Sequence, residues 1–244
     1  MKATILAPDT AGRHNGAPAA SRDRILRGNT YRDASTVCLI PTRGLIHARV
    51  VQAWWGMMTP MNQRFSRLFA WGMEVAHAYE EMVANVLAHP DLGTWKYVLT
   101  LEEDNLPPPD GLLKLIEAIE GGVDGQKYDA VGGLYWTKGE GGQPMCYGQP
   151  DVLPLNFIPW LPVPGTVARC NGLGMGFTLF RMAMFKGLPR PWFRTVQEYA
   201  PGVGGRAYTQ DLWFFEQAGR AGHRFACDAR VLVGHYNQSE DVVW

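Results

Sequence analysis

The chain has no excess of either charge, since 23 lysines and arginines balance 23 aspartates and glutamates. A neutral sequence provides no overall field that would draw the protein onto nucleic acid or an anionic membrane, although it leaves room for a local basic groove. Long apolar runs are also missing: none approaches the roughly 18 residues of a membrane-spanning helix, and residues 1–8 lack the apolar core of a signal peptide. We therefore expect a soluble protein without a membrane span.

The chain has only four cysteines, and Cys38, Cys146, Cys170 and Cys227 form no CxxC pair. This spacing favours neither a zinc knuckle nor a disulfide framework. Thiols without a pairing pattern fit a reducing compartment, so we expect a cytoplasmic protein. A length of 244 residues allows one α/β domain with a full core and is short for two domains.

Two segments lack the periodicity of helices and strands. Residues 9–33 are rich in Ala, Gly, Arg and Asn, so we expect residues 1–34 to form a flexible N-terminal arm and residues 35–244 to form the folded domain. Residues 138–165 contain six prolines and several glycines. Because long loops in compact domains are frequently functional, we expect this segment to be an irregular excursion on the acceptor side of the site.

Strand and helix patterns alternate along the rest of the chain. Short apolar runs predict buried strands, and runs with one apolar face predict helices. Asp110 is expected to cap the helix whose apolar face carries Leu112 and Ile116. The alternation predicts an α/β domain with a largely parallel sheet. The expected order is strand 36–40, helix 46–54, strand 64–69, helix 74–87, strand 97–101, a helix after residue 110, and strand 128–136.

The most informative segment is the acidic end of the strand predicted at residues 97–101. Glu102, Glu103 and Asp104 follow that strand directly, and Pro107 comes soon after them. Adjacent carboxylates repel one another unless a cation lies among their oxygens, and Mg²⁺ and Mn²⁺ prefer such ligands. Ligands of open α/β sheets also bind beyond the carboxyl ends of the strands. The alternative is a solvated acidic turn that caps the next helix.

Two further candidates lie late in the chain. Thr209 predicts a helix start that places Asp211 in the first turn, where its ionised form is favoured. Asp211 could stabilise the helix dipole or act as a general base. His235 follows a strand predicted over residues 224–233 and could be a hydrogen-bonded structural residue or a ligand for Mn²⁺ beside carboxylates.

Glycines and aromatic residues mark other candidate positions. The GxGxG pattern at residues 172–176 lacks the βαβ context of a dinucleotide site, so we expect these glycines to let the backbone approach another ligand. Tyr147, Phe157 and Trp160 could stack on a sugar or base, or could fasten the excursion to the core. Both interpretations remain open at this point.

Taken in order, these pieces resemble a family-2-like GT-A glycosyltransferase. The resemblance covers most of residues 36–236 and rests on five segments: Pro41-Thr42-Arg43, Glu102-Glu103-Asp104, residues 171–176, Thr209-Gln210-Asp211 and Val233-Gly234-His235. It implies a single GT-A (Rossmann-like) domain with a central, mostly parallel sheet flanked by helices. The acidic segment corresponds to the DxD motif of that family.

The resemblance also implies roles for individual residues. Asp211 would be the catalytic base, and Glu102, Asp104 and His235 would hold Mn²⁺ or Mg²⁺ against the diphosphate of a UDP-sugar or GDP-sugar. The residues implied for donor binding are Pro41, Thr42, Arg43, Glu103, Asn171 and Gly172, and those for the acceptor side are Trp136, Tyr147 and Trp160. Two departures stand out. Glu102 stands where the DxD motif has its first Asp, and its longer side chain would leave Asp104 as the sole direct carboxylate ligand. Gln210 stands where the family has a Glu before the catalytic Asp, a change that bears on acceptor recognition.

The expected function is therefore transfer of a sugar from a nucleoside-diphosphate sugar to an acceptor hydroxyl. Two alternatives remain: nucleotidyl transfer to a sugar phosphate, and a non-catalytic module that binds a nucleotide or glycan. The first normally needs a glycine-rich phosphate loop, and residues 41–44 are short for one. The acceptor could be a glycan, a small molecule, a protein or a modified DNA base, and the neutral charge argues against DNA.

Overall fold

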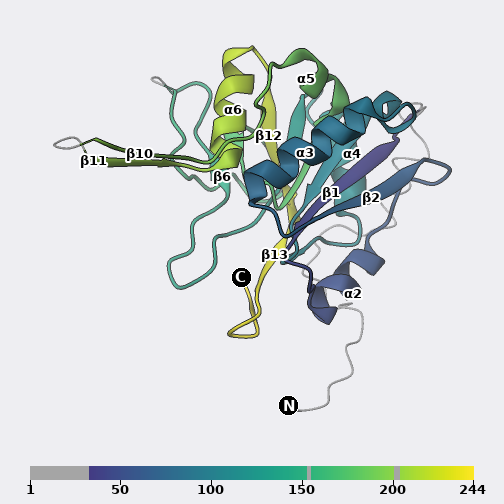
Figure 1. The fold of residues 1–244 in the computed structure, drawn as a ribbon, viewed down its shortest axis with the longest axis horizontal. Helices are drawn as coiled ribbons and strands as arrows, with labels where there is room; N and C mark the ends of the chain where they lie inside the picture. The colour runs from purple at the N-terminus through teal and green to yellow at the C-terminus, as the bar shows by residue number, and fades with distance from the viewer. Residues whose placement is uncertain (1–32, 153–154, 201–203) are drawn as a thin grey trace.

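The computed structural model describes residues 33–152, 155–200 and 204–244. The arm predicted for residues 1–34 therefore lies almost entirely outside the described residues. A seven-stranded sheet organises the chain, with the strand order β2-β1-β3-β9-β5-β12-β7 (Figure 1). Its strands are β1 (Thr36–Thr42), β2 (Phe65–Trp71), β3 (Tyr97–Leu101), β5 (Ala130–Leu134), β7 (Val167–Cys170), β9 (Phe177–Arg181) and β12 (Phe225–Leu232).

Most strands of this sheet run in one direction. β1 pairs in parallel with β2 and β3, and β5 pairs in parallel with β12. β9 is antiparallel to both β3 and β5, and β7 is antiparallel to β12. Five strands thus share a direction and only β7 and β9 oppose it, which confirms the predicted mostly parallel α/β sheet.

Helices cover both faces of the sheet. Alternate residues of β1 separate into two cores, because successive strand residues point to opposite faces: Val37 belongs to one core and Cys38 to the other. The first core contains side chains of α3, α5 and α6, and the second contains side chains of α2 and α4. The helices are α2 (Ala48–Gly56), α3 (Val75–Ala88), α4 (Gly111–Ile119), α5 (Met182–Gly187) and α6 (Gln210–Arg220), with a 3₁₀ turn at Leu92–Thr94. None of the described helices is long and apolar enough to cross a membrane.

Short strands carry the later segments of the chain. The hairpin of β10 (Val196–Ala200) and β11 (Gly204–Tyr208) projects away from the sheet (Figure 1). β6 (Cys146–Tyr147) pairs with β8 (Gly172–Leu173). β13 (Gly234–Asn237) lies between β4 (Asn105–Leu106) and β14 (Val242–Val243), so the chain after β12 returns to the acidic end of β3.

Asp110 differs from its predicted role. It occupies the N-cap position of α4, but within the described residues its side chain makes no capping hydrogen bond. Its carboxylate instead pairs with Lys114 Nζ at 2.8 Å, and both side chains are buried. A buried ammonium without a charged partner costs more free energy than one unmade capping hydrogen bond at a helix end. The Asp110 carboxylate therefore pairs with Lys114 instead of capping α4.

The four cysteines are buried free thiols. Although they are far apart in the sequence, the Cys146 sulfur lies within hydrogen-bond reach of Cys170 and Cys227. They meet because β12 pairs with β7, and β6 pairs with β8, which follows β7 directly along the chain. Sequence spacing therefore could not reveal this cluster.

Candidate active site

A cavity of about 300 Å³ lies at the carboxyl ends of β1 and β3. Because these strands are adjacent and parallel, their ends meet at one edge of the sheet. Met73 and Val75, at the start of α3, also line the cavity, and the sequence analysis did not identify them. Both residues follow the carboxyl end of β2, and this position is the sequence signal that could have indicated them. The full lining is Pro41, Thr42, Arg43, Met73, Val75, Glu102, Glu103 and Asp104.

Glu103 joins the two strand ends. Its Oε2 accepts hydrogen bonds from Thr42 Oγ1 at 2.7 Å and from the Arg43 backbone N–H at 2.8 Å, and the Arg43 guanidinium pairs with Oε1. Burial would raise the pKa of Glu103, but the bonds from Thr42 and Arg43 outweigh it and lower the pKa. Glu103 thus shapes the cavity, while the Arg43 side chain remains 85% exposed at its mouth.

Asp104 and His235 lie together beside this cavity. Their Oδ2 and Nε2 atoms are 3.6 Å apart. His235 Nδ1 lies 2.7 Å from the carbonyl oxygen of Trp136, and because a carbonyl only accepts, Nδ1 must carry the proton and Nε2 is left facing Asp104. Burial would raise the pKa of Asp104, but its interactions with His235 and with the Lys138 ammonium outweigh burial and lower the pKa to about 2.

Lys138 supplies the positive charge at this position. Its ammonium pairs with Asp104 Oδ2, the same oxygen that faces His235. Lys138 belongs to the start of the excursion, so the first residues of that segment are fastened to the acidic end of β3. The sequence analysis did not identify Lys138, because its contact with Asp104 spans 34 residues.

Glu102 precedes this pair and has a raised pKa. Burial, together with the nearby charges of Asp104 and Asp211, raises the pKa of Glu102 to about 8, while Lys138 and a hydrogen bond with Tyr79 oppose the shift. Within the described part of the chain, no three His, Cys, Asp or Glu side chains are arranged to hold one metal ion. The expected set of Glu102, Asp104 and His235 is therefore not grouped as three ligands in this part of the chain, although Asp104 and His235 lie together. Their roles as metal ligands stay predictions.

Asp211 lies in the first turn of α6, as predicted, and its side chain is buried. Its Oδ1 accepts the Leu212 backbone N–H at 2.9 Å. The expectation that the helix start favours the ionised form is wrong in sign: burial raises the pKa of Asp211, and the hydrogen bonds from Thr209 and Leu212 offset this only in part. Desolvation of a carboxylate outweighs the helix dipole here.

Three tyrosines lie close enough to Glu102 and Asp211 to be affected by their charges. The negative charges of Glu102 and Asp211 both act on Tyr79, Tyr135 and Tyr147, and after burial they raise the pKa of each hydroxyl. Tyr147 belongs to the excursion, so that segment comes close to Asp211. The predicted acceptor-side position of Tyr147 is compatible with this placement, and its role stays a prediction.

Asn171 and Gly172 were expected in the donor pocket, but they hold the excursion. Asn171 Nδ2 donates to the carbonyl of Asn156 at 2.9 Å, and Gly172 pairs with Tyr147 between β8 and β6. Neither is among the described residues that line the 300 Å³ cavity. The space at Gly174 is also taken by protein, since a Cβ there would lie 2.1 Å from Tyr135 Oη. The donor-binding roles of Asn171 and Gly172 stay predictions.

Trp136 and Trp160 pack partly buried against the first core. Trp160 Nε1 donates to the Gly148 carbonyl at 2.9 Å, which fastens one part of the excursion to another. The contacts of Trp160 favour the anchoring interpretation over a sugar platform. Trp136 contributes its carbonyl to His235, and its ring remains a predicted acceptor contact.

Replacing Trp160 by Ala should lower the free energy of unfolding by about 1–3 kcal/mol, because a partly buried indole and one hydrogen bond are lost. Urea denaturation measures this change. A Trp160→Ala variant with the same free energy of unfolding as the wild type would contradict the anchoring role.

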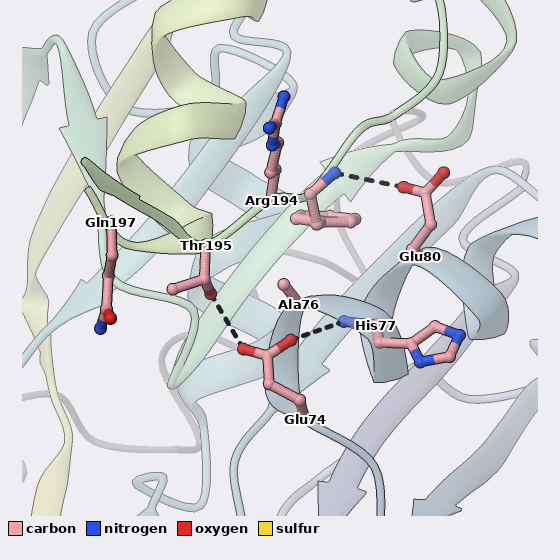
Figure 2. A pocket seen from close by; sticks show the side chains of 8 residues that line it. Glu74, Ala76, His77, Glu80, Arg194, Thr195 and Gln197 are labelled. Atoms are coloured by element: carbon pink, nitrogen blue, oxygen red, sulfur yellow. Dashed lines mark hydrogen bonds between the residues drawn. The ribbon is translucent and has the colours of Figure 1, made fainter. Parts of the chain in front are cut away.

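A second cavity, of about 680 Å³, lies between the start of α3 and the chain that leads into β10. Figure 2 shows Gln197 and His77 on opposite sides of it, with Glu74 between them. No sequence motif pointed to this cavity, because its two walls are more than 100 residues apart. Its lining residues are Glu74, Ala76, His77, Glu80, Phe193, Arg194, Thr195 and Gln197.

No family model and no curated protein sequence matches the chain. Solved structures do resemble it. The structure titled A197 from STIV has a TM-score of 0.58 at 18% identity, with 86% of this chain and 92% of that chain covered. GalNAc-T7, determined with UDP, GalNAc and Mn²⁺, has a TM-score of 0.55 at 10% identity; 95% of this chain matches about half, 53%, of that chain. At these identities the likeness concerns the fold, which is the GT-A-like α/β fold that the sequence predicted.

Proposed function

We propose that the protein is a metal-dependent, family-2-like glycosyltransferase that uses a UDP-sugar or GDP-sugar. One observation carries the proposal: Asp104 and His235 lie side by side at the cavity formed by the ends of β1 and β3, with the buried carboxylate of Asp211 nearby. A GT-A-like fold supports this assignment, as does a similar fold in a protein that binds UDP and Mn²⁺.

Asp104 and His235 together fit a divalent ion such as Mn²⁺ or Mg²⁺. Asp104 is ionised, and the Trp136 carbonyl orients His235 so that Nε2 faces the carboxylate. A backbone carbonyl bonded to the second ring nitrogen is the usual support of a metal-binding histidine. Asp104 and His235 would hold the ion, which when bound offsets the negative charge of the departing diphosphate.

The remaining residues have separate tasks. Thr42 and Arg43 would contact the nucleotide from the end of β1, in a geometry that Glu103 fixes. Asp211 would accept the proton of the attacking acceptor hydroxyl. Its raised pKa makes it a stronger base than an ordinary carboxylate, which suits proton transfer near neutral pH. The hydroxyl groups of Tyr79, Tyr135 and Tyr147 lie within the electrostatic influence of this carboxylate.

The structure offers little support for nucleotidyl transfer. Gly44, the only glycine of the 41–44 turn, faces the Trp71 ring, and a Cβ there would lie 2.6 Å from Trp71 Nε1. This glycine therefore faces a protein side chain. Incubation with UDP-sugars and GDP-sugars and Mn²⁺, followed by phosphorus NMR, tests the function. We expect a nucleoside diphosphate as product; pyrophosphate would indicate nucleotidyl transfer, and unchanged donor would indicate a binding module.

Replacing Lys138 by Met should tighten binding of Mn²⁺ in the absence of nucleotide by about 3- to 10-fold, because an ammonium beside Asp104 repels a second cation. Titration followed by electron paramagnetic resonance of free Mn²⁺ measures the affinity. Lys186→Met, on the exposed end of α5, is the matched control. Equal Mn²⁺ affinity in the wild type and Lys138→Met would show that Lys138 does not compete with the ion.

A further inference from the structure

We propose that the 680 Å³ cavity between α3 and residues 193–197 is the acceptor site and that it binds a neutral sugar. This inference rests on the proposed glycosyl transfer. The volume of the cavity lies in the range of sites for small molecules, and its lining includes carboxylate, imidazole, hydroxyl and amide groups.

Two carboxylates fix the walls of the cavity in advance. Glu74 Oε1 accepts from Thr195 Oγ1 at 2.9 Å, and Oε2 accepts from the His77 backbone N–H at 3.1 Å (Figure 2). Glu80 Oε2 accepts from the backbone N–H groups of Trp192, at 2.8 Å, and Phe193, at 3.2 Å. These bonds hold the segment before β10 against α3, so a ligand would enter a site that is already formed.

Several polar groups at the cavity remain available to a ligand. Among the described residues, the His77 imidazole and the Gln197 carboxamide have no hydrogen-bond partner, and both residues are exposed. The Arg194 guanidinium turns toward α6, where it lies 5.5 Å from the centre of the Trp213 ring. An amide and an imidazole both donate and accept, as the hydroxyl groups of a sugar do.

The charges of the lining select a neutral ligand. A phosphate or sialic acid would face the carboxylate of Glu74, which is held ionised because the bonds from His77 and Thr195 outweigh burial and lower its pKa. A neutral, hydroxyl-rich molecule meets no such repulsion. Of the acceptor classes that the sequence left open, this favours a glycan or a small sugar.

The position of the cavity suits an acceptor. Met73 and Val75 line the donor cavity, whereas Glu74 and Ala76 line this one, so the two cavities share the start of α3. On the other side, Arg194 contacts Trp213, two residues after Asp211 on α6. An acceptor held here would lie next to the start of α3, which the donor cavity also borders, and near the first turn of α6.

Saturation-transfer NMR with methyl glycosides of common neutral hexoses, pentoses and N-acetylhexosamines tests this inference. Wild-type protein should bind at least one glycoside, with or without UDP and Mn²⁺. His77→Ala and Gln197→Ala should each weaken that binding by about 5- to 20-fold, the effect of one lost hydrogen bond of about 1.0 to 1.8 kcal/mol. The matched controls are His223→Ala and Gln238→Ala, which lie on other parts of the surface.

Absence of glycoside binding in the wild type would overturn the acceptor assignment, and so would equal binding in His77→Ala, Gln197→Ala and the controls. UDP binding with Mn²⁺ is measured on the same samples. A wild-type protein that does not bind UDP with Mn²⁺ would count against the proposed function. A wild-type protein that binds UDP with Mn²⁺ but binds no glycoside would count only against this cavity as the acceptor site. The two proposals can therefore fail separately.

Discussion

Replacing Asp211 by Asn should lower the rate of sugar transfer by about 10²- to 10⁴-fold, the range typical for loss of a general base. Asn keeps the shape of the side chain and an Oδ1 that can accept the Leu212 N–H. The substitution therefore removes basicity and leaves the start of α6 intact. Because Asp211 is buried near Glu102, a neutral amide also removes a charge that burial disfavours, so the fold should not suffer.

The measurement is release of UDP or GDP from the donor in the presence of an acceptor. Binding of UDP and Mn²⁺ to Asp211→Asn should match the wild type, which separates a chemical defect from a binding defect. Asp91→Asn, on an exposed ion pair with Arg64, is the control. Turnover of Asp211→Asn close to that of the wild type would show that Asp211 only supports the helix.

Replacing Asp104 by Asn or His235 by Ala should weaken Mn²⁺ binding in the presence of UDP by at least about 10- to 100-fold, since even supporting residues of metal sites have effects of that size. Each variant removes one of the two donors that the structure brings together. Asp104→Asn also frees Lys138, whose side chain is 30% exposed and can be solvated, so little stability should be lost.

Electron paramagnetic resonance of bound and free Mn²⁺ measures this loss, and circular dichroism confirms that both variants are folded. His223→Ala provides a histidine control, because that side chain pairs with Asp129 away from the cavity. If Asp104→Asn and His235→Ala both bound Mn²⁺ as tightly as the wild type, the assigned ligands would be wrong.

Local patterns predicted much of this fold. The helix over residues 74–87 became α3 with Glu74 as its N-cap, because an apolar face and a capping side chain are both local signals. The acidic end of β3 and the Pro41-Thr42-Arg43 end of β1 could be placed at one site because parallel neighbouring strands end at one edge. The position of His235 at the same edge of the sheet could be predicted because His235 directly follows a predicted strand.

Other features depended on tertiary contacts. The raised pKa of Asp211 comes from burial, which a helix-start pattern cannot reveal. Asn171 supports the excursion because Asn156 happens to lie opposite it, and the space at Gly174 is filled by Tyr135. The 680 Å³ cavity has walls that Glu74 and Thr195 connect by a hydrogen bond across 121 residues of sequence. No local sequence pattern could therefore predict it.

The most direct test of the proposed site is calorimetric titration of the wild-type protein with UDP and with GDP, first with Mn²⁺ and then with EDTA. We predict that one of the two nucleotides binds with Mn²⁺ and that chelation weakens its binding by at least about 10-fold, because Asp104 and His235 engage the diphosphate only through a shared cation. Two results would contradict a metal-dependent nucleotide-sugar site: a nucleotide that binds with the same affinity in Mn²⁺ and in EDTA, or a protein that binds neither UDP nor GDP with Mn²⁺ present.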